Sequence, residues 1–251
     1  MDVIHVDDGK YSKYEKMILE RDRCRKEADL ALFEYTRIFG DQITAVFEQK
    51  ITCIELKKML TYGMLYLNRG EEIDVMSILI QIKSEMTEYD EQLEKMIAEN
   101  KNCKNTTTKQ IPESDALKVK QIYRSIAKKL HPDLNPLTEQ NEELKELWQR
   151  NVIAYKSNDL KEIEEVEVLV EKALSELGLG KTTITIPNID EKIENIRKEI
   201  EEIKSTDPYL YKIIINDPVL IKEKLQELED ELNEYKKYAA QLRVEIEKFI
   251  K

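Results

Sequence analysis

The stretch KKLHPDLNP, residues 128–136, interrupts a long run of helix-forming sequence with one of the two histidines of the chain and two of its six prolines. A proline disfavours helical geometry in the residue before it, so Pro132 predicts that a helix ends near His131. Asp133 or Asn135 could cap a following helix, because both side chains accept hydrogen bonds from the free N–H groups at a helix start. The stretch therefore predicts a short turn between two helices.

Helical periodicity flanks this turn on both sides. In the upstream sequence KVKQIYRSIAKKL, residues 118–130, apolar side chains recur on one helical face, and the downstream sequence shows a second such face. Asp159, followed three residues later by Glu162, is a start signal for a further short helix over 159–177. Residues 116–177 are therefore predicted to form an antiparallel helix pair with a trailing helix. The two faces are Val119, Ile122, Tyr123, Ile126 and Leu130, and then Leu144, Leu147, Trp148, Asn151, Ala154 and Tyr155.

The helix before the turn is basic, against the trend of the whole chain. With 51 acidic and 40 basic residues the chain has a formal net charge of −11, so as a whole it should repel nucleic acid and anionic membranes. The twelve residues 118–129 nevertheless contain five basic side chains and no acidic one. This cluster predicts a local docking face for an acidic partner. Its members are Lys118, Lys120, Arg124, Lys128 and Lys129.

The composition predicts an all-α protein of a reducing compartment. Charged residues make up 36% of the chain, whereas glycine and proline, which interrupt helices and strands, contribute only six each. Three cysteines without a CxxC pair favour free thiols over disulfides or zinc. The charged first fifteen residues do not resemble a signal peptide, and no run approaches the ~20 apolar residues of a membrane span. A cytoplasmic protein without a membrane anchor is expected.

Residues 1–100 are predicted to form a three-helix bundle or an antiparallel coiled coil. A stripe of apolar residues predicts a helix over 11–39, and Gly40 is expected to stop or kink it. The next helix, 43–67, is apolar on more than one face, as buried helices are, and Gly70 supplies a left-handed cap after it. The third helix has an unbroken heptad seam. Its seam residues are Val75, Leu79, Ile82, Met86, Tyr89, Leu93 and Met96.

Two polar linkers, 101–115 and 178–188, are predicted to separate the central helices from their neighbours. Beyond the second linker, residues 189–251 show two heptad seams separated by a segment with two prolines, which predicts an antiparallel coiled-coil hairpin. The first seam covers only about half of the second, so the outer half should pack on the N-terminal bundle or on a second copy of the chain. The seams are Ile189, Ile193, Ile196, Ile200 and Ile203, and Ile221, Leu225, Leu228, Leu232, Tyr235, Ala239, Leu242, Ile246 and Phe249.

The central region resembles the J-domain of DnaJ-type cochaperones over about sixty of the 251 residues. The resemblance rests on YRSIAKKLHPDLNP, residues 123–136, where a basic amphipathic helix precedes the His-Pro-Asp triplet and Asn-Pro follows it. More weakly, it rests on LWQRNVIAY, residues 147–155, in which Ala154-Tyr155 matches a recurrent pair of the family.

This resemblance implies binding to a DnaK-type chaperone and stimulation of its ATPase. In the family the His-Pro-Asp turn signals to the chaperone, and the basic face of the preceding helix docks on an acidic surface, where charge sets orientation and encounter rate. The fold expected is all-α: an elongated helical bundle or coiled coil with a central J-domain-like antiparallel helix pair. Carried over to this chain, the signalling residues are His131, Pro132 and Asp133, and the docking residues are Lys120, Tyr123, Arg124, Lys128, Lys129 and Asn135.

The chain also departs from the family pattern. Ser125 and Leu134 stand where the family often carries basic residues, and the linker sequence NTTTKQIPESD, residues 105–115, occupies the place of the family's first helix. The Gly/Phe-rich segment, the zinc repeats and the β-rich client-binding region of full DnaJ are absent from the sequence. Two functions therefore stay open. One is a cochaperone whose coiled-coil arms select a client or a location, and the other is a coiled-coil scaffold or interaction protein whose J-like segment no longer signals.

Two other motifs carry less information. GLGKTTITI, residues 178–186, resembles the end of a phosphate-binding loop, but Ser175 stands where that motif needs a glycine, so Gly178 and Gly180 are expected to cap a helix. The segment His5–Asp8 is a poor set of metal ligands, and no serine or cysteine motif accompanies the histidine of the turn as a general base. No enzymatic activity, cofactor or metal site is predicted.

Overall fold

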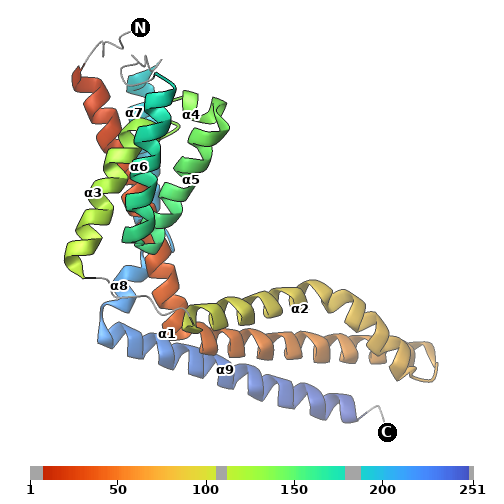
Figure 1. The fold of residues 1–251 in the computed structure, drawn as a ribbon. Helices are drawn as coiled ribbons and strands as arrows, with labels where there is room; N and C mark the ends of the chain where they lie inside the picture. Colours follow the sequence, from red (N-terminus) through yellow and green to blue (C-terminus); the bar gives the residue numbers. More distant parts are fainter. Residues whose placement is uncertain (1–7, 106–111, 179–187, 249–251) are drawn as a thin grey trace. The chain divides into compact units, whose positions relative to one another are not determined.

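The structure, a computed structural model, describes residues 8–105, 112–178 and 188–248, and every regular element within them is an α-helix (Figure 1). The predicted all-α fold is confirmed. None of the helices in these three ranges combines the length and the hydropathy needed to cross a bilayer. The helices are α1 (Asp8–Arg69), α2 (Val75–Asn105), α3 (Glu113–Leu130), α4 (Leu137–Gln140), α5 (Glu142–Ser157), α6 (Leu160–Glu176), α7 (Ile189–Ser205), α8 (Tyr211–Ile215) and α9 (Pro218–Glu247).

Helix α1 runs for 62 residues without a break at Gly40, so the predicted stop there is wrong. A glycine inside a helix costs only about 1 kcal/mol relative to alanine, which favourable contacts can outweigh. Gly40 has a packing reason instead, because a Cβ atom built on it would lie 2.5 Å from Oδ1 of Asn100 on α2. The cap predicted at Gly70 is confirmed: its φ is +69°, and its N–H donates to the carbonyl of Leu67 at 3.0 Å.

The chain divides into two compact units whose boundaries differ from the predicted ones. The first unit combines Met1–Asp29 with Thr108–Leu210, and the second combines Leu30–Thr107 with Tyr211–Lys251. The predicted bundle of residues 1–100 is therefore shared between the units, since the start of α1 belongs with the central helices. Periodicity along one segment reveals a face to be covered, but it does not reveal which distant segment covers that face.

Helices α3, α5 and α6 of the first unit share one apolar core, and α3 and α5 run in opposite directions (Figure 1). The predicted ends are confirmed: α3 ends at Leu130 with His131 as its C-cap, and Asp159 caps α6 by accepting from the N–H of Glu162 at 3.0 Å. Asn141 caps α5 in the same way, after the short helix α4 that the sequence did not predict. The buried core residues are Val119, Tyr123, Ile126, Ala127, Leu130, Leu144, Leu147, Ala154, Tyr155, Ile163, Val166, Val170 and Ala173.

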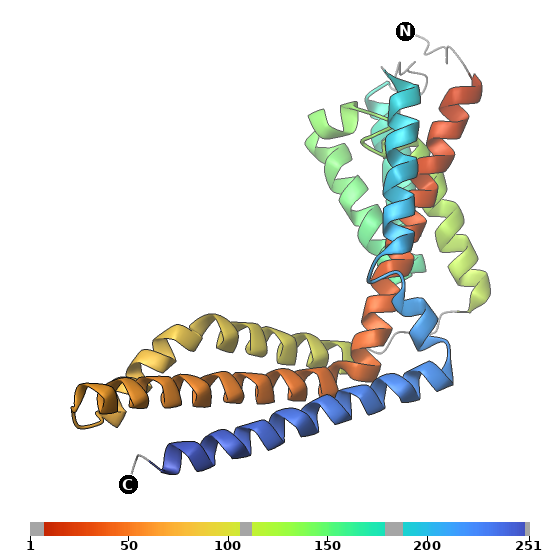
Figure 2. The ribbon, with the colours of Figure 1, turned by 180° about the vertical axis from the view of Figure 1, so that it is seen from behind.

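Helix α7 completes the first unit by packing beside the start of α1 (Figure 2). Ile193, Ile196 and Ile200 of α7 are buried in one cluster with Tyr14 and Ile18 of α1. Because α7 belongs to the first unit and α9 to the second, the predicted coiled-coil hairpin of the C-terminal region is wrong. The α7 seam has the predicted period, but the start of α1 offers an apolar stripe that is an equally good partner.

The second unit consists of the rest of α1 with α2, α8 and α9, and the three long helices lie side by side (Figure 2). Leu228 of α9 is buried with Phe39 and Val46 of α1. The outer half of the α9 seam is also covered within this unit, since Leu242 and Ile246 are buried. Of the two partners predicted for that half, helices of the same chain therefore account for its burial.

The predicted seam of α2 is displaced at its start. Ile78, Ile82 and Met86 are buried against α1, whereas Leu79 is 46% exposed. Ile78 and Leu79 are adjacent, so either residue could begin the buried face of the helix. In the structure the buried residues follow a four-residue step from Ile78 through Ile82 to Met86.

Some predictions fall outside the described residues. Phe249, at the end of the predicted α9 seam, Gly180 in the second linker and His5 near the start are among them. The described part of that linker includes Gly178, whose φ of +65° directly after α6 confirms its predicted cap.

Candidate functional site

The His-Pro-Asp turn is stabilised by hydrogen bonds among its own residues. The backbone N–H of Asn135 donates to the carbonyl of His131 at 2.7 Å, and the N–H of Asp133 donates to Nδ1 of His131 at 3.0 Å. The side chain of Asn135 donates to the carbonyl of Lys129 at 2.8 Å and accepts from the N–H of Leu137 at 3.1 Å. Asn135 thus ties the end of α3 to the start of α4. The predicted cap at Asp133 or Asn135 is wrong, however, since the N-cap residue is Pro136 in α4 and Asn141 in α5.

His131 is buried, although it lies in a turn at the end of a helix. Its exposed fraction is 5%, and its ring lies edge-on to Trp148 with 4.8 Å between the centroids. Since Nδ1 accepts a hydrogen bond from the N–H of Asp133, the neutral ring carries its proton on Nε2, which faces Oδ2 of Asp22 at 3.5 Å. The orientation of the imidazole ring is therefore determined by the turn, by α5 and by α1.

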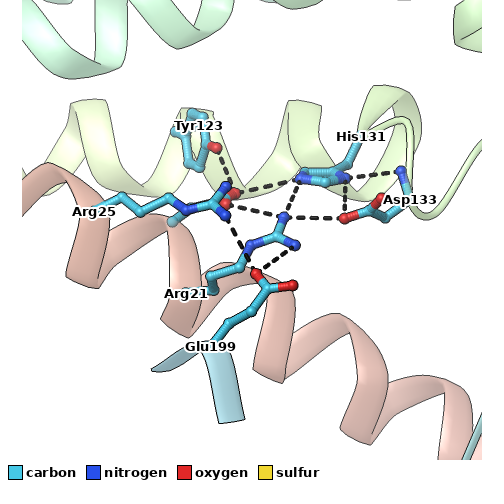
Figure 3. Close-up of polar contacts among 7 residues, drawn as sticks. Arg21, Arg25, Tyr123, His131, Asp133 and Glu199 are labelled. Atoms are coloured by element: carbon cyan, nitrogen blue, oxygen red, sulfur yellow. Dashed lines mark hydrogen bonds and ion pairs between the residues drawn. The ribbon is translucent and has the colours of Figure 1, made fainter. Parts of the chain in front are cut away.

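Two residues of α1 complete this site from more than a hundred positions away in the sequence (Figure 3). Nη2 of Arg21 donates to Oδ2 of Asp133 at 3.0 Å. Oδ2 of Asp22 accepts a 2.7 Å hydrogen bond from the hydroxyl of Tyr123 on α3. Arg21 is only 8% exposed, and its other terminal nitrogen lies 3.7 Å from the carboxylate of Glu199 on α7.

Burial and neighbouring charge act against each other at Asp22. Burial alone would raise the pKa of this carboxyl group, but the hydrogen bonds from His131 and Tyr123 and the charge of Arg21 outweigh burial and lower the pKa below its usual value. Burial, followed by the charge of Asp22, raises the pKa of the Tyr123 hydroxyl. Asp22 is therefore an ionised acceptor at neutral pH, and Tyr123 is a neutral donor.

Two of the predicted docking residues are buried inside the unit. Tyr123 is 4% exposed and Asn135 is 7% exposed, and both side chains are committed to hydrogen bonds within the chain. The ring of Tyr123 also stacks on that of Tyr155, with 3.9 Å between the centroids. In this arrangement neither residue presents its polar group to a partner, so their predicted docking role does not describe this state of the molecule.

The basic residues of α3 differ in their availability. Arg124 is exposed and forms no ion pair with any described residue. Lys120 is half-buried. Lys128 pairs with Glu15 of α1 at 3.0 Å, and Lys129 pairs with Glu171 of α6. The predicted basic face therefore exists, but part of its charge is already matched by carboxylates of the same unit.

A half-open pocket of about 420 Å³ lies beside the turn. Helix α5 lines one side with Trp148, Val152 and Tyr155, and α1 lines another with Arg21 and Arg25, together with the three residues of the turn. The pocket therefore separates part of α1 from α5 next to the triplet.

Lys26, which follows Arg25 on α1, also lines this pocket. Its ammonium group donates to the carbonyl of Tyr155 and to Oδ1 of Asn158, both at 2.6 Å, and lies 3.8 Å from the centroid of the Tyr155 ring. Burial, and then the charge of Lys120, lowers the pKa of Lys26 to about 8. This lysine donates to one of the last carbonyls of α5, where a cation also interacts favourably with the helix dipole.

Sequence reasoning placed the triplet in its turn but missed Arg21 and Asp22. Both lie in a charged stretch of α1 without a motif, and their partners are remote in the sequence. Leu134 was the one sequence feature that indicated a contact with another segment, since an apolar residue in a polar turn is expected to be buried. The structure buries Leu134 completely, against Tyr14 and Ile18 of α1.

Clusters of metal-ligating side chains are absent from the described part of the chain. Within 8–105, 112–178 and 188–248, no three His, Cys, Asp or Glu side chains gather in a group that could hold a metal ion. The histidine of the His5–Asp8 segment lies outside these ranges.

No protein-family model matches the chain, and neither the curated proteins nor the solved structures contain a match to it.

Proposed function

We propose that the chain is a J-domain-type cochaperone that binds a DnaK-type chaperone and stimulates its ATPase. The observation that carries the proposal is the position of the triplet: His131, Pro132 and Asp133 begin the connection from a basic helix, α3, to the helix α5 that packs against it. The resemblance in sequence and the helical arrangement thus concern the same residues.

The chemistry of the exposed residues fits an acidic partner. Arg124 and Lys118 are exposed on α3. Cations on a helix surface steer the encounter with an acidic surface, while a turn with internal hydrogen bonds presents its groups in one geometry. The client, and the part of the chain that selects it, stay open.

One observation favours the alternative function, a coiled-coil scaffold or interaction protein with a J-like segment that does not signal. His131 is buried, and its hydrogen-bonding atoms are occupied by Asp133 and Asp22. In that alternative the triplet is a structural joint between α3, α5 and α1.

Steady-state ATPase turnover of the host's DnaK-type chaperone, measured with and without the full chain, tests the proposal. We expect stimulation by the wild type and its loss with Asp133→Asn, which retains the size of the side chain but removes its charge. Asp29→Asn is the matched control, because Asp29 also forms an ion pair within the first unit, with Lys156 at 2.7 Å, but lies away from the turn. Stimulation by Asp133→Asn at the wild-type level would favour the scaffold.

Time-resolved binding of the chain to the same chaperone tests the basic face. Reversal of Arg124 and Lys120 to glutamate should weaken chaperone binding mainly through a slower association rate, and added salt should have the same effect on the wild type, since exposed charges are screened over ~8–10 Å at physiological ionic strength. Binding that is indifferent to both changes would point to an interface other than α3.

A further inference from the structure

We infer that residues 11–25 of α1, which we call the cover segment, hold the His-Pro-Asp turn in a closed state and must leave it before a chaperone can engage the triplet. The inference rests on the proposed function and adds a regulatory contact within the chain to it. Its basis is that the cover segment occupies the recognition groups of the turn through polar contacts, buries an apolar residue of the turn, and forms an ion pair with the basic helix.

The polar contacts occupy the groups that a chaperone would have to reach. Arg21 holds the carboxylate of Asp133 at 3.0 Å (Figure 3). Asp22 holds the hydroxyl of Tyr123 at 2.7 Å and faces Nε2 of His131 at 3.5 Å. Two neighbouring residues of α1 therefore engage one group on α3 and two groups of the turn. A partner cannot form hydrogen bonds with the same atoms until Arg21 and Asp22 have moved.

The apolar contact explains a departure from the family pattern. Leu134, directly after the triplet, is 0% exposed and lies in the cluster that contains Tyr14, Ile18 and Ile196. A leucine in an open turn would expose apolar surface to water, whereas under the cover segment it becomes an anchor. Leu134, which departs from the family pattern, thus packs the turn against the cover segment.

One carboxylate of the cover segment already neutralises a cation of the basic helix. Glu15 of the cover segment pairs with Lys128 of the basic helix at 3.0 Å, and Asp22 contacts the same helix at Tyr123. An acidic chaperone surface would form ion pairs with the basic residues of the same helix. The intramolecular contact and the intermolecular one therefore compete for shared groups.

The contact is built so that it can open. Between the cover segment and α5 lies the half-open pocket of about 420 Å³, lined by Arg21, Arg25, Trp148 and Tyr155, in place of close apolar packing. Leu134 anchors α1 on one side of the triplet, whereas on the side of the pocket α1 is held by long polar side chains. Such contacts exchange more readily with a competing polar surface than an interdigitated core does.

The test compares Arg21→Gln with Arg25→Gln in the full chain. Both residues lie on the cover segment one helical turn apart, and both approach Glu199, at 3.7 and 3.2 Å, but only Arg21 contacts the triplet. We expect Arg21→Gln to lower the concentration needed for half-maximal stimulation of the chaperone ATPase by about tenfold, the factor that corresponds to one lost charge-assisted hydrogen bond. Arg25→Gln should leave that concentration unchanged.

A second measurement follows opening directly, through the native thiol of Cys24. This side chain is 0% exposed in the cluster of Tyr14, Leu134 and Ile196. In a chain with Cys53→Ser and Cys103→Ser, the rate of alkylation of Cys24, read by mass spectrometry, should rise when the ATP-bound chaperone is added at saturation. It should also rise in Arg21→Gln without the chaperone, and Asp22→Asn serves as the second variant if Arg21→Gln loses its helicity.

The outcomes separate the two proposals. If the wild type stimulates the ATPase while saturating chaperone leaves the alkylation rate of Cys24 unchanged, the closed state is not a barrier and the inference is wrong, although the proposed function stands. If neither the wild type nor any opened variant stimulates the ATPase, the proposed function is wrong, and the regulatory inference falls with it.

Discussion

The guanidinium group of Arg21 lies 3.0 Å from the carboxylate of Asp133, although 112 residues separate the two in the sequence. The contact makes the start of α1 part of the same site as the turn after α3. It also changes what substitutions in the turn should do, because residues that look like a solvated loop in the sequence have a buried environment.

Replacement of His131 by glutamine should lower the stability of the protein as well as its proposed activity. His131 is 5% exposed, accepts a hydrogen bond from the N–H of Asp133 and contacts Trp148. Loss of a buried hydrogen-bonding partner lowers the free energy of unfolding by about 1–3 kcal/mol, which urea denaturation followed by circular dichroism can measure. Arg124→Gln is the control on the exposed face of α3 and should change the free energy of unfolding by no more than about 0.5 kcal/mol. Equal stabilities for the two variants would mean that His131 is not packed as described.

Asp22 should make the stability of the first unit sensitive to acid. Its pKa in the folded protein is lower than the value of 3.8 expected for the unfolded chain, so its contribution is fully present above pH 3.8 and is lost as the pH falls through the folded value. Asp22→Asn retains the shape of the side chain but cannot titrate. We expect the wild type to be more stable than Asp22→Asn at pH 7, and the difference between them to shrink as the pH falls below 3.8. A difference that stays constant over this range would exclude Asp22 as the titrating group.

Local signals explain which parts of the fold the sequence could predict. Pro132 ends α3, and Asp159 starts α6, through hydrogen bonds and steric limits that act within a few residues. The helical faces around the turn were predictable for the same reason, since burial on one side of a helix produces a period that is visible in the segment itself.

Which helix packs against which was not predictable, because the apolar face of one helix can pack against the apolar faces of several others. The isoleucines of α7 pair with Tyr14 and Ile18 and not with the next seam along the chain. The stop predicted at Gly40 was wrong, because the residue that requires its missing side chain, Asn100, is far away in the sequence. Likewise, the triplet could be predicted from residues 118–136, but Arg21 and Asp22 could be found only in three dimensions.

Asn151 should be a site where a substitution raises stability. It lies on the buried face of α5 with 0% exposure, and neither side-chain polar atom has a hydrogen-bond partner among the described residues. Asn151→Leu replaces an amide by an apolar group of similar shape, which removes the cost of an unpaired buried polar group, so the free energy of unfolding should rise by about 1 kcal/mol or more. Thermal and urea denaturation at pH 7 would measure the change.

A second asparagine at the start of the same helix provides the control for Asn151. Asn141 accepts a 3.0 Å hydrogen bond from the N–H of Leu144 as the N-cap of α5. Asn141→Leu should therefore lower the free energy of unfolding by about 1 kcal/mol. If Asn151→Leu destabilised the protein as much as Asn141→Leu does, the amide of Asn151 would have to be satisfied in solution.

Gly40 and Asn100 should be energetically coupled in the second unit. Alanine is favoured over glycine inside a helix by about 1 kcal/mol, so Gly40→Ala would stabilise α1 if nothing lay against it. In the wild type, however, the new Cβ atom would lie 2.5 Å from Oδ1 and 2.8 Å from Cγ of Asn100. Asn100 would have to move, and its 2.7 Å hydrogen bond to Asp41 would be lost. Gly40→Ala should therefore lower the free energy of unfolding in the wild type and raise it by about 1 kcal/mol in an Asn100→Ala background.

A double-mutant cycle measured by urea denaturation gives the coupling energy directly. A value near zero would show that the close approach of α1 and α2 at Gly40 does not constrain this position, and that contact with Asn100 is not the reason for the glycine.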